Sequence, residues 1–259
     1  MDLGIKGKTA IVCASSEGLG RACAEALAEN GVHVFLNGRR RQILEAAAHD
    51  MSERHGAEVS FIAADATTEE GREAIRSACP APDILVNNAA GPAPGDWRQS
   101  DRDQWQAAVD SNMLSAIFLI RAFADDMAER GFGRIVNITS ALVKAPNQVI
   151  SLSVAARLGL TGFSKGIAAG YIGRNVTINN LLPEQFETQR LRKNLAYIAE
   201  QKGIGLDEEI ASQLAGAPAG RFGKPEEFGA TCAFLCSTHA GYMSGQNILL
   251  DGARLPGLF

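Results

Sequence analysis

Short apolar runs alternate with longer amphipathic stretches along the whole chain. The runs are rich in valine, isoleucine and leucine, and each has the length of a buried parallel strand rather than of a helix. Between them, apolar positions recur at helical spacing and end at punctuating residues such as Gly31 and Gly131. The runs predict strands at 9–13, 32–36, 59–63, 84–86, 134–138, 176–182 and 247–250.

Helices are predicted in the intervening segments, at about 18–30, 41–54, 103–130, 153–171 and 226–236. A polar insert at about 188–214 also has helix-forming composition. Repeated strand–helix units indicate an α/β fold, in which a doubly wound parallel sheet carries helices on both faces. Because no linker, repeat or low-complexity tract divides the chain, we expect a single domain over 1–259, with the insert as a substrate lid.

Composition narrows the class of protein. A formal net charge of −4 argues against a nucleic-acid binder, which is usually basic. The longest apolar stretch, about 113–120, is too short to cross a bilayer, and the first residues lack the apolar core of a signal peptide. Cys232 and Cys236 lie one helical turn apart, but no second pair or histidine cluster completes a metal site. We therefore expect a cytoplasmic protein with five reduced, buried cysteines, no metal, and no membrane or nucleic-acid partner.

The turn after the first predicted strand is rich in small residues and predicts a nucleotide site. It reads Cys-Ala-Ser-Ser-Glu-Gly-Leu-Gly over 13–20 and leads directly into a helix. Small residues let the backbone approach a pyrophosphate, which then lies at the helix N-terminus. Glycine-rich turns also serve simply to pack a helix on a strand, but the position directly after the first strand favours the nucleotide interpretation.

Several further motifs make the chain resemble the short-chain dehydrogenase/reductase family, and within it the 3-oxoacyl-carrier-protein reductases. The nucleotide turn matches the family's Thr-Gly-x-x-x-Gly-x-Gly, with Cys13 and Ala14 replacing its first two residues. Segment 87–90 resembles Asn-Asn-Ala-Gly, and 179–188 resembles Asn-x-x-x-Pro-Gly-x-x-x-Thr with Glu184 in place of glycine. Segments 221–227 and 245–252 resemble the family's C-terminal signature. The resemblance implies a Rossmann-type fold, a nicotinamide cofactor and a small-molecule substrate.

The family pattern assigns the cofactor contacts, and the end of the second strand bears on which nicotinamide is bound. Arg39 lies where NADP-preferring members carry an arginine, and a guanidinium suits a phosphate. Glu17 argues the other way, because those members often carry a basic residue there. We expect NADP, with NAD as the alternative. The residues assigned to the cofactor are Ala14, Ser15, Ser16, Gly18, Leu19, Gly20, Arg39, Asp65, Ala66, Asn88, Ala89, Ala90, Arg157, Pro183 and Thr188.

The catalytic pattern of the family is only half present. Ser140 matches its serine, and Asn112 matches its asparagine. The tyrosine expected thirteen residues after Ser140 is Ser153, and the lysine four residues later is Arg157. A serine hydroxyl is a poor general acid near pH 7, and arginine stays protonated, so this pair does not repeat the tyrosine–lysine proton relay. Arg157 can still hold a ribose hydroxyl or an anion.

Each of these residues also has a purely structural interpretation. Ser153 suits a helix N-cap, and Arg157 a partly exposed helix position. Lys144 and Glu184 are candidate acids or bases because they border the expected site, yet both also fit solvated loop charges. The basic start of the insert, 190–193, either attracts an anionic substrate or simply solvates a helix, and we favour solvation.

Three functions remain in view. The first is an NAD(P)-dependent oxidoreductase of a carbonyl or alcohol substrate with an atypical proton supply. The second is non-redox chemistry on the same fold, such as proton abstraction or carbon–carbon cleavage. The third is a catalytically inactive nucleotide-binding relative. The resemblance also implies a homo-oligomer, a tetramer or dimer, in which helices 103–130 and 153–171 pair between copies.

Overall fold

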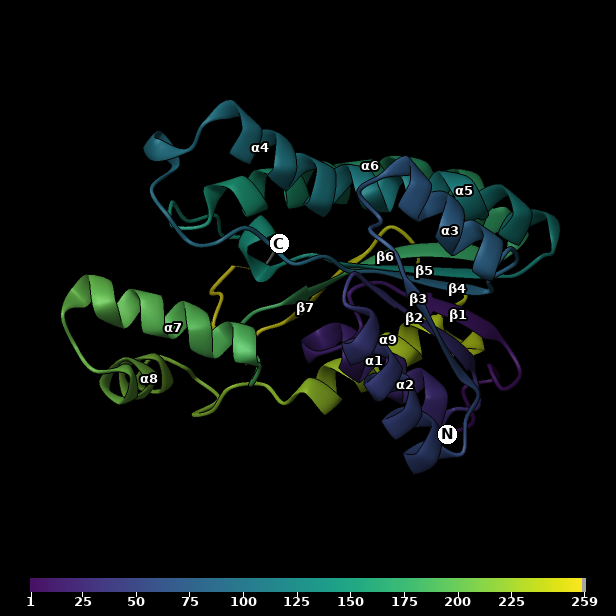
Figure 1. The fold of residues 1–259 in the computed structure, drawn as a ribbon, viewed down its shortest axis with the longest axis horizontal. Coiled ribbons are helices and arrows are strands. Elements are labelled where there is room, and N and C mark those ends of the chain that lie inside the picture. Colours follow the sequence, from purple (N-terminus) through teal and green to yellow (C-terminus); the bar gives the residue numbers. More distant parts are fainter. Residues whose placement is uncertain (258–259) are drawn as a thin grey trace.

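Seven parallel strands form one twisted sheet in the computed structural model, which describes residues 1–257 (Figure 1). The spatial order is β3-β2-β1-β4-β5-β6-β7, so the chain starts in the middle, winds to one edge, and then returns to build the other. This confirms the predicted doubly wound α/β fold. The strands are β1 (Thr9–Val12), β2 (His33–Gly38), β3 (Val59–Ala63), β4 (Ile84–Asn87), β5 (Gly133–Ile138), β6 (Val176–Pro183) and β7 (Asn247–Leu250).

Helices cover both faces of the sheet, and each face has its own apolar core (Figure 1). One layer contains α1 (Gly18–Glu29), α2 (Arg41–His55) and α9 (Pro225–Cys236). The other contains α3 (Glu69–Ala78), α5 (Ser115–Glu129) and α6 (Ser151–Tyr171). Strand β1 shows the division, because Ala10 and Val12 pack in the first core and Ile11 in the second.

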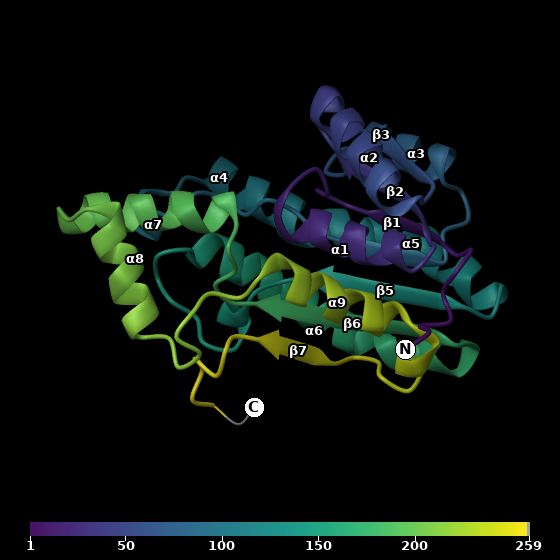
Figure 2. The same ribbon diagram turned by 90° about the horizontal axis from the view of Figure 1, so that it is seen from below.

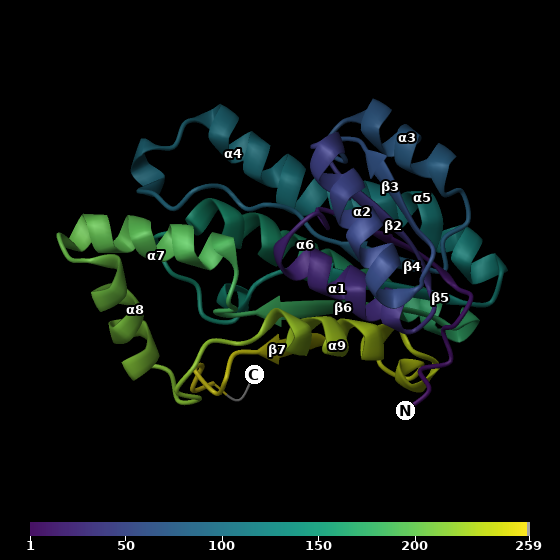
Figure 3. The same ribbon diagram turned by 60° about the horizontal axis from the view of Figure 1, so that its bottom comes forward.

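The remaining helices project beyond the carboxyl ends of the strands, as Figures 2 and 3 show. They are α7 (Gln189–Lys202) and α8 (Leu206–Ala215), which form the predicted insert, and α4 (Arg102–Val109) after β4. The buried carboxylate of Glu209 fixes α8 to α7, because it accepts a hydrogen bond from Lys202 at 2.6 Å. The insert is thus an ordered helical pair over the edge of the sheet where the nucleotide turn also lies.

Four asparagines stand in register across the second half of the sheet. Asn87, Asn137, Asn180 and Asn247 are mutual partners on β4 to β7. Asn87 donates to Asn137 at 2.8 Å, Asn137 to Asn180 at 3.1 Å, and Asn180 to Asn247 at 2.8 Å. Asn137 also donates to Ser164 of α6 at 2.9 Å. Because each buried amide needs its neighbour, the ladder specifies strand register more sharply than apolar side chains do.

The structure corrects the helices predicted from sequence in three places. Helix α3 was not predicted, because it carries few apolar residues. The predicted helix 103–130 is α4 and α5 joined by a π-helical turn at Asp110–Leu114. Helix α6 begins at Ser151, so Ser153 is its third residue and not its N-cap.

The joined helix 102–129 is long and apolar enough to cross a membrane by length and composition. In this fold it is a core element. Its residues Leu119, Phe123 and Met127 are at most 1% exposed, and they pack in the second apolar core against the sheet. The five cysteines are free and buried, as predicted, and burial raises the pKa of the Cys13 thiol to about 12.

Candidate functional site

The turn between β1 and α1 is shaped to receive a phosphate group. Ala14 adopts a left-handed conformation, with φ of 45°, which costs more for alanine than for the family's glycine. A β-carbon on Gly20 would lie 2.4 Å from the Ala14 carbonyl, so only glycine fits there. Asn88 donates to that same carbonyl at 3.2 Å, and the buried Ser15 hydroxyl donates to Val12 at 2.7 Å. The turn is therefore held in place before any ligand arrives.

Helix α1 begins without a side-chain cap. Its N-cap residue, Glu17, makes no capping hydrogen bond and instead pairs with Arg40 at 2.9 Å. The uncapped N–H groups and the positive end of the helix dipole are then available to an anion. A β-carbon on Gly18 would lie 4.0 Å from Thr188, which places the start of α7 opposite this turn.

Arg39 and Asp65 mark the far end of the nucleotide site. The Arg39 side chain is 74% exposed, and its guanidinium lies 3.9 Å from the Asp65 carboxylate, so this pair is loose. Burial acts to raise the pKa of Asp65, but hydrogen bonds from Thr67 and the charge of Arg39 lower it overall. Since Arg40 offsets the charge of Glu17, the acid that argued against NADP is neutralised within this structure.

Arg157 is buried, with 8% of its surface exposed, which corrects the alternative of a partly exposed helix residue. Its Nε donates to Ser153 Oγ at 3.1 Å, and its Nη2 to the Ala89 carbonyl at 3.1 Å. Its Nη1 donates to the carbonyls of Ile138 at 2.6 Å and Thr139 at 3.1 Å. Arg157 thus connects α6 to the carboxyl ends of β4 and β5. Burial and the nearby charge of Arg190 lower the pKa of Arg157 to about 10.

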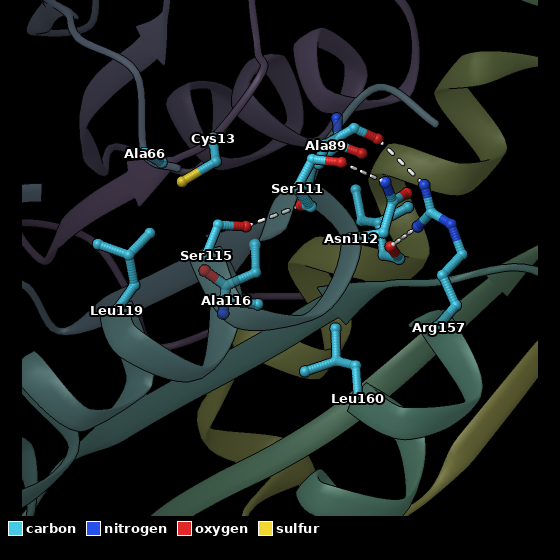
Figure 4. A pocket seen from close by; sticks show the side chains of 13 residues that line it. Cys13, Ala66, Ala89, Ser111, Asn112, Ser115, Ala116, Leu119, Arg157 and Leu160 are labelled. Atoms are coloured by element: carbon cyan, nitrogen blue, oxygen red, sulfur yellow. Dashed lines mark hydrogen bonds between the residues drawn. The ribbon is translucent and has the colours of Figure 1, made fainter. Parts of the chain in front are cut away.

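Asn112 lies in the π-helical turn, a feature that is frequent at functional sites. Its Nδ2 donates to Ser111 Oγ at 2.7 Å, while its buried Oδ1 has no partner among the described residues. Figure 4 shows Asn112 facing Arg157 in a small pocket, with Ala66 and Ala89 in the same lining. The structure therefore brings together predicted catalytic and cofactor residues at the ends of β4 and β5.

Ser140 lies two residues after the end of β5, next to Thr139, whose carbonyl accepts a hydrogen bond from Arg157. Its Oγ accepts a hydrogen bond from the Leu142 backbone at 3.2 Å, which orients the side chain and leaves its own proton free to donate. Two hydroxyl groups are thus tied to the surroundings of Arg157: Ser153 Oγ accepts from its Nε, and Ser140 follows Thr139, whose carbonyl accepts from its Nη1.

Glu184 and Lys144 differ sharply in environment. Glu184 follows β6, with its carboxyl 19% exposed and 3.6 Å from the guanidinium of Arg254. Burial raises the pKa of Glu184 despite the opposing charge of Arg254. Lys144 is exposed after the turn that follows Ser140, and its ammonium makes no ion pair with any residue in 1–257.

The other residues assigned to the cofactor lie along the same carboxyl edge of the sheet. Ser16 and Leu19 flank the start of α1, and Thr188 caps α7 by accepting from the Leu191 backbone at 3.2 Å. The remaining positions follow β4 or end β6, namely Asn88, Ala89, Ala90 and Pro183.

Two further residues lie at this edge, of which Gly91 was not singled out from sequence and Arg190 was named only within the basic start of the insert. Gly91 follows the segment that resembles Asn-Asn-Ala-Gly, and Arg190 begins the insert. Arg190 is exposed and donates to the carbonyls of Gly91 at 3.0 Å and Pro92 at 2.9 Å, so it joins the insert to the loop after β4. Sequence offered no signal for this contact, because it joins a loop and a helix far apart in the chain. The choice between solvation and attraction of an anionic substrate for 190–193 stays a prediction.

Known proteins with related sequences and structures cover nearly the whole chain. A family model described as enoyl-(acyl carrier protein) reductase matches residues 13–253. The 3-oxoacyl-[acyl-carrier-protein] reductase FabG of Vibrio harveyi is 31% identical over 254 residues, covering 96% of this chain and 98% of that protein. The NADPH-dependent reductase BacG of Bacillus subtilis is 30% identical over 256 residues, covering 96% and 98%.

Among solved structures, the L-sorbose reductase of Gluconobacter frateurii, complexed with NADPH and L-sorbose, superposes with a TM-score of 0.93. It is 32% identical to this chain, and the match covers 100% of both chains. Sheet order, nucleotide turn and full-length similarity agree, and the chain belongs to the short-chain dehydrogenase/reductase family.

Proposed function

We propose that the protein is an NADP-dependent oxidoreductase that interconverts a carbonyl and an alcohol, with a proton supply that differs from the family's tyrosine–lysine relay. The observation that carries this proposal is the preformed turn of residues 13–20. The turn has no room for a β-carbon at Gly20, and it leads into helix α1, whose N-terminus has no side-chain cap. Those features fit a pyrophosphate, which would lie over Gly18 and Leu19.

NADP fits the other end of the nucleotide site better than NAD. The exposed guanidinium of Arg39 is available to a 2′-phosphate, while the nearest acid, Asp65, is already held by Thr67. Two relatives support this choice, since BacG is an NADPH-dependent reductase and the sorbose reductase was crystallised with NADPH.

When bound, NADPH would supply a hydride to the carbonyl carbon of the substrate. A proton must then reach the carbonyl oxygen. In this chain the hydroxyls of Ser140 and Ser153 are placed to donate to that oxygen. Arg157 keeps its own proton but donates into Ser153 Oγ, which polarises the Ser153 hydroxyl. The buried positive charge also stabilises a developing alkoxide. Water replenishes the proton, because none of these side chains is a neutral-range acid.

The test is steady-state NADPH oxidation by the purified protein over a panel of ketones and aldehydes, with NADPH affinity measured separately by fluorescence. We expect measurable turnover, and we expect Ser140→Ala to lower kcat by about a hundredfold or more with NADPH affinity unchanged. Ser77→Ala, which removes an exposed hydroxyl from α3, is the matched control. Tight NADPH binding without turnover of any carbonyl compound would refute the proposal.

The second candidate is non-redox chemistry on the same fold, and Glu184 is the observation that favours it. Its raised pKa and its position after β6 suit a general base. Loss of a substrate without change in nicotinamide absorbance, abolished by Glu184→Gln, would support this reading. The third candidate, an inactive relative, draws on the departures at Ala14, Ala90, Ser153 and Arg157, and failure to bind either NAD(H) or NADP(H) in calorimetry would favour it.

A homo-oligomer is also part of the proposal. The outer face of α6 is exposed and apolar, and it includes Leu158, which is 41% exposed, and Gly162 and Gly166, which have open space above them. This face suits pairing with a second copy, as the family resemblance implies. A cytoplasmic location and the absence of membrane or nucleic-acid partners stay predictions.

A further inference from the structure

Helix α8 buries no apolar side chain, so polar contacts decide where it lies. Glu209 is the one buried residue of α8, and it bonds within the insert, to Lys202 of α7. Within residues 1–257, every hydrogen bond that runs from α8 to the body of the protein has Gln213 as its partner on the helix. The place of α8 relative to the sheet therefore depends on the contacts of this one residue.

Arg254 is the main partner of Gln213. Its Nη2 donates to Gln213 Oε1 at 2.9 Å and to the Gln213 carbonyl at 3.3 Å, and its Nη1 donates to Gln185 Oε1. Gln185, which follows β6, itself donates to Gln213 Oε1 at 3.0 Å. The last carbonyls of a helix have no partner inside it, so Arg254 also caps the C-terminus of α8. One guanidinium thus joins α8 to the end of β6.

The turn after β7 holds Arg254 in this place. Asp251 accepts from the Ala253 backbone at 3.0 Å and from the Leu255 backbone at 2.8 Å, and Ala253 adopts a left-handed conformation with φ of 66°. Figures 2 and 3 show this segment turning back from β7 toward the end of α8. The Glu184 carboxylate is 3.6 Å from the guanidinium, beyond hydrogen-bond distance, so the two glutamines carry the attachment.

The attachment continues from α8 into α7. The Glu209 carboxylate accepts from Gln213 at 2.8 Å and from Lys202 at 2.6 Å. A continuous series of hydrogen bonds therefore runs from Arg254, which lies outside the insert, through α8 to the C-terminal end of α7.

The N-terminal end of α7 borders the candidate site. Thr188 caps the helix and lies opposite Gly18 of the nucleotide turn, and Arg190 reaches the loop after β4. Because the Arg190 contact is exposed and α7 buries only Leu195 and Ala199, the position of α7 depends on its pairing with α8.

We propose that Arg254 is a positioning residue that holds the helical insert against the body of the protein and keeps α7 in place at the candidate site. When the insert is released, only a fraction of the molecules has the arrangement that binds substrate, and the apparent affinity falls by that fraction. The attachment is a property of the fold, whereas its effect on substrate rests on the proposed oxidoreductase function.

Hydrogen–deuterium exchange of Arg254→Met tests the attachment without any need for turnover. Methionine keeps an extended side chain but loses every N–H donor. We expect the amides of α8 to exchange about tenfold faster than in wild type, while those of β4, β5 and β6 keep their rates. Arg174→Met, which removes an exposed arginine near the start of β6, is the matched control and should exchange as wild type does. Unchanged exchange in α8, or an equal increase in α8 and the sheet, would overturn the proposal.

Gln213→Leu tests whether Arg254 acts through that residue. Leucine keeps a side chain of similar size but removes the amide that accepts from Arg254. Residues that act through one another have non-additive effects. We therefore expect the double variant Gln213→Leu/Arg254→Met to exchange in α8 more slowly than the product of the two single effects, and a full product would contradict the proposal.

The split between KM and kcat tests the consequence for the candidate site. At saturating NADPH, we expect Arg254→Met to raise KM for the carbonyl substrate about tenfold and to change kcat by less than about threefold, because molecules with substrate bound have the insert in place. An unchanged KM, or a fall in kcat alone, would overturn the positioning role. Protein that binds NADPH but reduces no carbonyl compound refutes the proposed function, and the exchange of α8 then decides on Arg254 by itself.

Discussion

Arg157, which stands where the family pattern has a lysine, makes more hydrogen bonds at the candidate site than its charge alone would suggest. Arg157 makes four hydrogen bonds, three of them to backbone carbonyls on two neighbouring strand ends. Hydrogen bonds to a charged group contribute about 1.5–3 kcal/mol each, so the residue is a cross-link of the site as well as a charge. Arg134 is buried on carbonyls in the same way, which shows that such a guanidinium needs no carboxylate partner in this fold.

Glu184 gives a prediction of pH dependence at the residue scale. Burial raises its pKa in the folded state above the usual 4.5, so the folded protein holds that proton more tightly than the unfolded chain. At a pH below its pKa in both the folded and the unfolded state, the Glu184 carboxyl is neutral in both and does not lower the free energy of unfolding. As pH rises through the folded-state pKa, the buried charge destabilises the fold.

Glu184→Gln removes this cost, so the stability of the variant relative to wild type should increase as pH rises from about 4 to 7. Urea unfolding at several pH values measures the difference, and Glu187→Gln, an exposed neighbour, controls for the change in net charge. A difference that does not vary with pH would show that the carboxyl titrates alike in both states.

At the scale of elements, hydrophobic periodicity predicts the strands well and some helices poorly. The strands were found within two residues at each end, because buried parallel strands are continuous apolar runs bounded by turns. Helix α3 was missed because it buries only Gly71 and Ile75. The π-helical turn at Asn112 was missed because 103–130 was interpreted as one continuous helix, and the turn contains no glycine or proline to mark it.

The candidate site shows the same division between local and non-local information. The nucleotide turn is local, and its resemblance to the family's motif is enough to assign Ala14, Gly18 and Gly20. The partners of Arg157 and the approach of Arg190 to Gly91 depend on how distant segments pack, which no periodicity encodes. The N-cap alternative for Ser153 failed for a related reason, since α6 begins two residues earlier without any side-chain cap.

The asparagine ladder supplies a prediction at the element scale. Asn137 is fully buried and bonds to Asn87, Asn180 and Ser164. Asn137→Ala therefore leaves the Asn87 amide nitrogen and the Asn180 amide oxygen without that partner, and it removes one bond to Ser164, which still donates to the Leu160 carbonyl. We expect a loss of about 3 kcal/mol or more in the free energy of unfolding, measured by urea denaturation. Asn247→Ala, at the exposed end of the ladder, removes one bond and should cost about 1 kcal/mol. Equal losses for the two variants would show that the ladder does not act as a connected unit.

For the whole molecule, the two ends of the candidate site rest on different supports, the α/β core and the helical insert of α7 and α8. The nucleotide end rests on β1, α1 and β2, and is set before ligand binds. The other end of the candidate site is bordered by α7, which Arg190 joins to the loop after β4. Helix α6 serves both the site and the molecular surface. Its inner face carries Ser153 and Arg157, and its outer face is exposed.

That outer face predicts how copies assemble. Leu158 is 41% exposed on α6, beside Gly162 and Gly166, and burying such a leucine against a second copy would contribute about 1.5–3 kcal/mol. We expect wild-type protein to be a dimer or tetramer by size-exclusion chromatography with light scattering, and Leu158→Glu to lower the mass, because a buried unpaired carboxylate opposes pairing. Ile43→Glu is the matched control, since Ile43 is similarly exposed, at 38%, but lies on α2. A monomeric wild type, or an unchanged mass for Leu158→Glu, would place the α6 face in solvent and leave Ser153 and Arg157 supported by a single chain.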